Sequence, residues 1–214
     1  MVVSELRRKN ASSAVPAVIS AISLLLCLPG SSWPQSQLRG QPRLPFTDEG
    51  ACPFEGCHYA AWTAKTPTVA RKDANTSSPV VFTIKSGEKI TALNGKVITL
   101  QFGIIKMLKP VVFDEVETRT VPYTSHKVDI PAGAVLYLLH NEGEGYCLYW
   151  YNSAAHHQDL YAESVGKGNA DFPWDVISEP KTEWWVKVKN HDGQTGWILN
   201  PFDFPGIDAY GGDN

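Results

Sequence analysis

Apolar and polar residues alternate most clearly between residues 183 and 189, near the C-terminal end of the chain. Trp184, Val186 and Val188 alternate there with one aromatic and two basic residues. Such a period of two predicts a strand with one apolar face. Asp192-Gly193 follows, and this pair predicts a tight turn because it tolerates the positive φ that hairpins need. Residues 196–199 return as a short strand, which Pro201 ends. The pattern predicts a β-hairpin.

Similar short segments, separated by turn residues, recur through the rest of the chain. The strands that we predict there span residues 59–64, 80–84, 89–93, 96–100, 135–139 and 146–151. Asn94-Gly95 is the strongest short hairpin signal among the turns, so we expect the strands on either side of it to pair around it. No segment of helical length carries a 3.6-residue period. These patterns predict an all-β protein with small antiparallel sheets.

Composition and charge narrow the function classes. The chain has 214 residues, of which 43% are apolar, and a formal net charge of −3. This is enough apolar material for one compact unit or two small ones. The charge is too small and too evenly spread to indicate a nucleic-acid partner. Seven Trp and eight Tyr fit a β-rich protein.

Residues 1–32 have the features of a signal peptide. A basic patch around Arg7 and Arg8 precedes an apolar run over residues 14–28, and small residues follow it at 29–32. The run is short for a membrane span, so no stable span is expected after cleavage, although a retained signal anchor is the alternative. We therefore expect an exported protein, periplasmic or secreted, in an oxidising compartment.

Three further segments carry no strand pattern. Residues 33–50 are rich in Pro, Gln, Ser and Arg and are predicted to be a disordered lead-in. Residues 152–180 form a long polar insertion, too long for an ordinary connection. The Gly-rich tail at 210–214 is predicted to be loose.

The C-terminal hairpin carries a resemblance to a known family. Trp185, Lys187-Val188, the polar turn at residues 191–194 and Gly196-Trp197-Ile198 resemble the distal hairpin of bacterial SH3-type (SH3b) domains, which occur in exported proteins. Residues 78–99 are similar to the first half of such domains. The resemblance implies SH3-like β-barrels.

The length of the chain suggests a tandem or split pair of these barrels. We place the first unit at residues 51–120 and the second at 121–209, which holds the insertion. Residues 109–131 and the insertion have no counterpart in a single SH3 domain. The sequence does not predict the oligomeric state.

The same resemblance implies a non-enzymatic binding module. Trp185 occupies the position of a groove-lining Trp, and the period of two directs it outward with Lys187, while Trp184, Val186 and Val188 face inward. The expected partner is a peptide or a cell-envelope polymer such as a peptidoglycan stem. The alternative is that Trp185 packs under the insertion. The predicted ligand-binding residues are Trp185, Lys187, Trp197, Tyr149 and Tyr151.

Cys52 and Cys57 are the first candidates for chemistry. In an oxidising compartment, two cysteines so close in sequence predict a structural disulfide. The alternative is an envelope redox or c-type haem carrier, because Cys57-His58 ends like a haem attachment motif, although four residues separate the cysteines instead of two. A zinc site would need two further soft ligands. We expect neither a cofactor nor a metal ion.

Two other groups of residues suggest chemistry more weakly. Cys147 is predicted to be a buried free thiol, and the alternative is a hydrolase in which Cys147 acts with His140. His156 and His157 are adjacent, so on a strand they point to opposite sides; a solvated loop is the default interpretation, and an adventitious metal site is the alternative. Glu142 and Glu144 flank a turn and are interpreted as solubilising residues, not as a calcium site.

Overall fold

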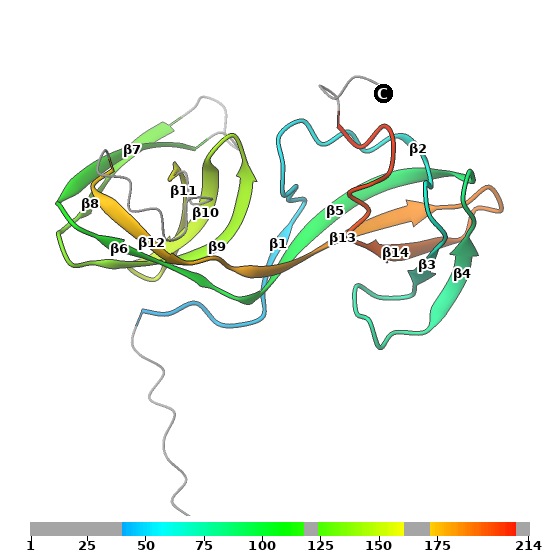
Figure 1. The fold of residues 1–214 in the computed structure, drawn as a ribbon, viewed down its shortest axis with the longest axis horizontal. Helices are drawn as coiled ribbons and strands as arrows, with labels where there is room; N and C mark the ends of the chain where they lie inside the picture. Colours follow the sequence, from blue (N-terminus) through cyan, green and yellow to red (C-terminus); the bar gives the residue numbers. More distant parts are fainter. Residues whose placement is uncertain (1–39, 118–123, 161–171, 209–214) are drawn as a thin grey trace, which may run out of the picture. The chain divides into compact units, whose positions relative to one another are not determined.

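The computed structural model describes residues 40–117, 124–160 and 172–208, and in these ranges the chain consists of β-strands and loops (Figure 1). No helix in these ranges has the length and apolar character that a membrane crossing needs. The predicted signal peptide, residues 33–39 of the lead-in and the predicted tail at 210–214 lie outside the described residues. The strands are β1 (Phe46–Glu49), β2 (Ala61–Thr63), β3 (Thr68–Arg71), β4 (Val80–Ile84), β5 (Lys89–Gln101), β6 (Gly103–Met107), β7 (Val111–Glu117), β8 (Thr124–Ile130), β9 (Val135–Gly143), β10 (Tyr146–Tyr151), β11 (Ala154–Asp159), β12 (Trp174–Ser178), β13 (Lys181–Lys189) and β14 (Thr195–Leu199).

The described strands form three antiparallel sheets, so the all-β prediction is confirmed. The larger sheet has seven strands in the order β1-β5-β13-β14-β3-β4, and β2 also pairs with β5. The central sheet has five strands in the order β11-β10-β9-β6-β12, and β7 pairs with β8. Among the described residues none of these sheets closes into a barrel, because β1 and β4 remain edges of the larger sheet and β11 and β12 remain edges of the central one.

The larger sheet is built from both ends of the described chain. β5 pairs with β13 along the length of that strand, and β13 pairs with β14 in the predicted C-terminal hairpin. Gly193 has the positive φ (81°) expected of that turn. The sheets do not divide near residue 120, because β6 and β7 belong with the later strands and β13 and β14 belong with the earlier ones. The pairing fits the split arrangement, in which the middle of the chain is inserted into the larger sheet.

A two-stranded ribbon continues from one sheet into the other. β5 is followed after one residue by β6, and β12 is followed after two residues by β13. β6 pairs with β12 just as β5 pairs with β13, which the green and orange ribbons of Figure 1 show. Gly103 lies at this transition, and a Cβ there would collide with the backbone at Ser178 and lie 2.9 Å from Pro180 N. The ribbon therefore needs a glycine at this point for close backbone approach.

Asn94-Gly95 does not form the predicted hairpin. β5 runs through both residues as a single 13-residue strand. Val188 pairs with Ala92 and Lys187 with Asn94, so Leu93 is an extra residue, a β-bulge that shifts the inward parity from Ala92 to Gly95. Gly95 is needed for space, because a Cβ there would collide with the Tyr59 hydroxyl and lie 2.8 Å from Trp184 Nε1.

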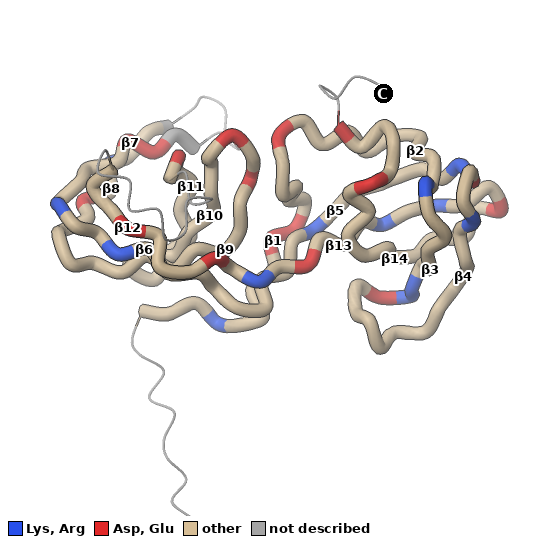
Figure 2. Tube along the Cα trace, in the orientation of Figure 1, with Lys and Arg blue, Asp and Glu red and all other residues tan. Residues whose placement is uncertain are grey.

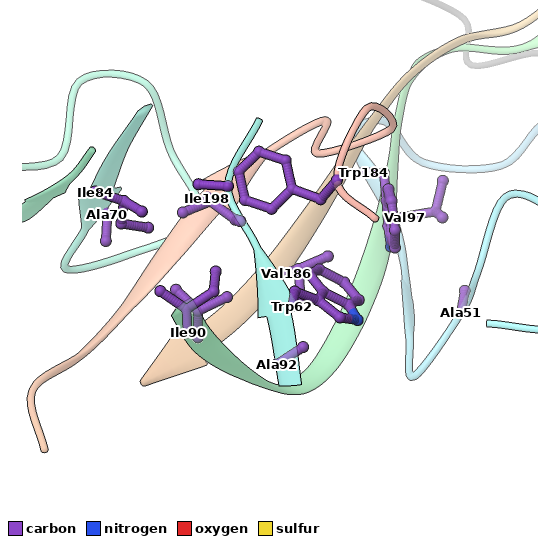
Figure 3. Packing of buried hydrophobic residues seen from close by; sticks show 13 residues of the cluster. Ala51, Trp62, Ala70, Ile84, Ile90, Ala92, Val97, Trp184, Val186 and Ile198 are labelled. Atoms are coloured by element: carbon purple, nitrogen blue, oxygen red, sulfur yellow. The ribbon is translucent and has the colours of Figure 1, made fainter. Parts of the chain in front are cut away.

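Two apolar clusters form the core. The cluster of the larger sheet gathers around Trp62 and Trp184, whose ring centroids are 6.1 Å apart, and Figure 3 shows Val97 and Val186 near them. The second cluster joins the central sheet to the β7–β8 pair, with Phe113 and Val128 packing against strands of the central sheet. The predicted inward face of β13 is confirmed, since Trp184, Val186 and Val188 are buried.

Two predicted loops contain strands. Residues 46–49 of the expected lead-in are β1, which pairs with residues 96–99 of β5 and buries Asp48. The expected insertion at 152–180 contains β11 and β12, so its described parts are edge strands of the central sheet, while residues 161–171 lie outside the described residues. Polar residues such as His156 concealed the strand pattern of β11, because an edge strand needs little apolar surface.

Candidate functional site

One face of the larger sheet gathers three of the predicted ligand-binding residues. Lys187 pairs with Trp197, and Trp197 pairs with Arg71 on β3. In antiparallel sheets such directly opposed residues lie on the same face. In the neighbouring row Trp185 pairs with Lys96. The structure thus brings together Trp185, Lys187 and Trp197 and adds two cations, Lys96 and Arg71, that the sequence did not single out.

Trp197 is the accessible aromatic residue of this face. It is half-buried, and Lys96 Nζ lies 4.5 Å from its ring centroid, within the range of a cation–π contact. Lys96 Nζ also forms an ion pair with Glu49 Oε1 at 2.8 Å. Figure 2 shows Lys and Arg on several strands of this sheet. We call Trp197, Lys187, Lys96 and Arg71 the basic aromatic face.

Trp185 lies beside this face but does not contribute surface. Only 1% of it is exposed, and its Nε1 donates a hydrogen bond to Glu183 Oε2 at 2.8 Å. The expectation that Trp185 is an outward, groove-lining residue is therefore wrong. The period of two correctly placed it on the face opposite Trp184, but parity gives the face of a strand and not its accessibility.

Tyr149 and Tyr151 belong to a different part of the molecule, since both lie on β10 of the central sheet. Tyr149 is fully buried, and its hydroxyl donates a hydrogen bond to Glu115 Oε1 at 2.6 Å. Burial raises the pKa of Tyr149 well above its ordinary value of 10.0, and the Glu115 carboxylate raises it further. Tyr151 is half-buried and packs against the second apolar cluster. Neither residue is part of the basic aromatic face.

Cys52 and Cys57 form a disulfide, as predicted. Because both sulfur atoms are used in this bond, thioether attachment of haem has no available sulfur while the disulfide is intact. Cys147 is buried and lies outside the disulfide, and its Sγ donates to Asn141 Oδ1 at 3.3 Å. The His140 ring nitrogens face Asp48 Oδ2 and the Asn141 carbonyl oxygen, at 3.1 and 3.0 Å. This geometry gives no support to a Cys147–His140 pair.

A second group of polar residues lies at Glu115. His156 Nδ1 is 2.8 Å and His126 Nε2 is 3.2 Å from Glu115 Oε2. Burial raises the pKa of Glu115, but the hydrogen bonds of His156 and Tyr149 and the charges of the two histidines outweigh it, so the pKa is lowered from 4.5. His157 faces the other way and contacts Glu142 Oε2 at 2.9 Å, which confirms the predicted divergence of the two adjacent histidines.

The sequence interpretation missed Glu115 and His126. A signal was present, because Glu115 has the same parity as Phe113 on β7, and His126 has the same parity as Val128 on β8. Polar residues at positions that continue a buried face indicate a site or a buried network. The third strand, β11, belongs to the central sheet, so the contact of its His156 with Glu115 could not be predicted from local sequence.

Asp48, His140 and Glu142 form another group of potential ligand atoms, all within 4.8 Å of one another. Asp48 is on β1 and His140 is on β9, so their contact joins the larger sheet to the central one. Thr99 adds a buried hydrogen bond between the same sheets, from its hydroxyl to the Leu139 carbonyl oxygen at 2.8 Å. We interpret this group as a structural connection.

Comparison with known proteins identifies no relative: no family model, no curated protein and no solved structure matches the chain.

Proposed function

We propose that this chain is an exported, non-enzymatic binding module that contacts its partner through the basic aromatic face. The observation that carries the proposal is the position of Trp197, a half-buried indole that lies on one sheet face with Lys187, Lys96 and Arg71. Trp and Arg are enriched in binding hot spots because they offer large contact area and directed polar groups.

The chemistry of the face favours a carboxylate-bearing peptide, such as the peptide stem of a cell-wall polymer. Lys187 and Arg71 flank the ring of Trp197 on neighbouring strands. An indole packs against apolar or proline-containing side chains, while the cations pair with carboxylates. The resemblance of the β13–β14 hairpin to SH3-type domains of exported proteins supports the same class of partner, with Trp197 in place of Trp185 as the contacting tryptophan.

Export is part of this proposal. The predicted signal peptide at residues 1–32 and the Cys52–Cys57 disulfide are both compatible with an oxidising compartment. A small disulfide loop also limits the conformational freedom of the unfolded chain.

Co-sedimentation of the purified mature chain with insoluble cell-wall material tests the proposal. We expect the parent protein to sediment with the wall and Trp197→Ala to remain in the supernatant. Tyr146→Ala is the matched control, since Tyr146 is an exposed aromatic residue of the central sheet. Equal sedimentation of the parent and Trp197→Ala, with circular dichroism showing both folded, would contradict the proposal.

A further inference from the structure

The inference concerns Glu115, His126 and His156, which two cross-strand pairs bring to one point. Glu115 on β7 is directly opposite His126 on β8, and Tyr149 on β10 is directly opposite His156 on β11. Directly opposed residues share a face of their sheet, so each pair presents its side chains together. The pairs meet at the Glu115 carboxylate, whose Oε1 accepts the Tyr149 hydroxyl and whose Oε2 faces both histidines.

The three potential ligand atoms have the spacing of a metal site. Glu115, His126 and His156 each offer one such atom, and these atoms lie within 4.8 Å of one another. With metal–ligand bonds of about 2.0–2.2 Å, neighbouring ligand atoms of a tetrahedral zinc ion are about 3.3–3.6 Å apart. The separations of 2.8 and 3.2 Å from Oε2 to the two nitrogens are slightly shorter, so small side-chain rotations would admit an ion.

The hydrogen bonds of His156 support an ion at its Nδ1 atom. Its Nδ1 faces the Glu115 carboxylate at 2.8 Å, and its Nε2 faces the Tyr151 carbonyl oxygen at 3.2 Å. A neutral imidazole has one N–H and cannot donate to both acceptors. A cation at Nδ1 would leave the single N–H at Nε2, where it can donate to the Tyr151 carbonyl oxygen. Metal-bound histidines commonly donate their other N–H to a backbone carbonyl, as Nε2 can do here.

Two ligands of the site are buried and therefore held in place, and the third is exposed to solvent. The side chains of Glu115 and His156 are 5% and 12% exposed, whereas that of His126 is 57% exposed. The Tyr149 hydroxyl, 2.6 Å from Oε1, holds the carboxylate in place from the buried side. An ion can therefore enter past His126 and meet two ligands that the core already positions.

We propose that Glu115, His126 and His156 bind a divalent transition-metal ion. Two imidazole nitrogens and one carboxylate suit zinc, copper or nickel better than magnesium or calcium, which prefer oxygen ligands. Three protein ligands leave one position of a tetrahedral ion for water on the side of His126. The site is separate in sequence and strand from the basic aromatic face, so the two proposals can fail independently.

Zinc titration of the metal-free chain, in competition with a chromophoric chelator, tests this site. The test variant is His126→Ala, because the exposure of this side chain makes it the ligand whose removal least disturbs folding. His157→Ala is the matched control, since this neighbour of His156 faces Glu142 instead. We expect one zinc ion per parent chain, a loss of affinity of at least about tenfold for His126→Ala and no change for His157→Ala.

Cobalt substitution gives a second measurement that does not depend on affinity alone. A four-coordinate Co²⁺ ion at this site is expected to give intense visible d–d bands, and His126→Ala is expected to weaken them. The absence of saturable zinc binding by the parent would overturn the proposal. Equal zinc affinities of His126→Ala and His157→Ala would also overturn it, because the ion would then bind elsewhere.

Discussion

Trp185 and Trp197 share one face of the larger sheet but have different roles. Trp185 is buried and bonded to Glu183, while Trp197 is half-buried under the ammonium group of Lys96. A buried tryptophan contributes apolar area and shape to the fold, and a partly exposed one can contact a partner. We therefore expect Trp185 to stabilise the fold and Trp197 to contact the partner.

Replacing each tryptophan with alanine is therefore expected to have different effects. Trp185→Ala should lower the free energy of unfolding by about 3–5 kcal/mol, because it leaves a large cavity. Trp197→Ala should lower it much less, since part of that ring is already in water. Urea denaturation followed by circular dichroism measures both values, and a larger loss for Trp197→Ala would contradict this assignment.

Tyr59 gives a pH prediction at the same scale. Burial raises the pKa of its phenol above 10.0, and the nearby Trp184 indole offsets part of this effect. Above about pH 10 the unfolded chain releases the Tyr59 proton more readily than the folded chain, so the stability that is complete at lower pH is lost as the pH rises. The parent should lose more stability than Tyr59→Phe between about pH 9 and about pH 11. Equal losses in urea denaturation at these two pH values would contradict the prediction.

At the scale of the element, β5 connects most of the larger sheet. It pairs with β1 near its C-terminal end, with β2 near its N-terminal end and with β13 along its other edge. The bulge at Leu93 allows one long strand to change inward parity, so that Ala92 and Gly95 both face the core. β5 can thus pair with both short strands, β1 and β2, along the edge that β13 does not occupy.

β5 also shows which strands can be predicted from sequence patterns and which cannot. The sequence pattern predicted β4 and β10 from their β-branched and aromatic residues, and it predicted the β13–β14 hairpin from its period of two and its turn. The hairpin predicted at Asn94-Gly95 did not form. Glycine is favoured in turns because its backbone is flexible, but it is also favoured in crowded strands because it has no side chain. Local composition cannot distinguish these uses. The space around Gly95 is defined by Tyr59 and Trp184, which are distant in sequence.

For the candidate sites, the sequence singled out Lys187 and Trp197 but not the cations opposite them. Arg71 and Lys96 join the basic aromatic face through pairing between strands that are about a hundred residues apart in the chain. Glu115, His126 and His156 come from three strands and two sheets. Such long-range pairing has no local signal in a single sequence.

At the scale of the whole molecule, the central segment from β6 to β12 is inserted between two paired strands. The β5–β13 pair of the larger sheet continues as the β6–β12 pair of the central sheet. The contacts of His140 with Asp48 and of Thr99 with Leu139 add polar connections between the same two sheets. At the transition between the sheets, Gly103 packs closely against the backbone of residues 178–180.

Gly103→Ala is expected to destabilise the protein by roughly 1–3 kcal/mol, because the added methyl group collides with the backbone of the neighbouring strand. Thr182→Ala is the control, as Thr182 is exposed and lies close to the transition on β13. Thermal unfolding midpoints measure both. A Gly103→Ala protein as stable as Thr182→Ala would show that the transition has more space than the structure indicates.

The central claim, binding through the basic aromatic face, is tested most directly by the dissociation constant for a carboxylate-bearing cell-wall stem peptide. Charge reversal of Lys187 is compared with charge reversal of Lys106, an exposed lysine of the central sheet. We predict that Lys187→Glu weakens binding severalfold, that Lys106→Glu leaves it unchanged, and that added salt weakens parent binding. Equal dissociation constants for the two charge-reversed proteins would contradict the account.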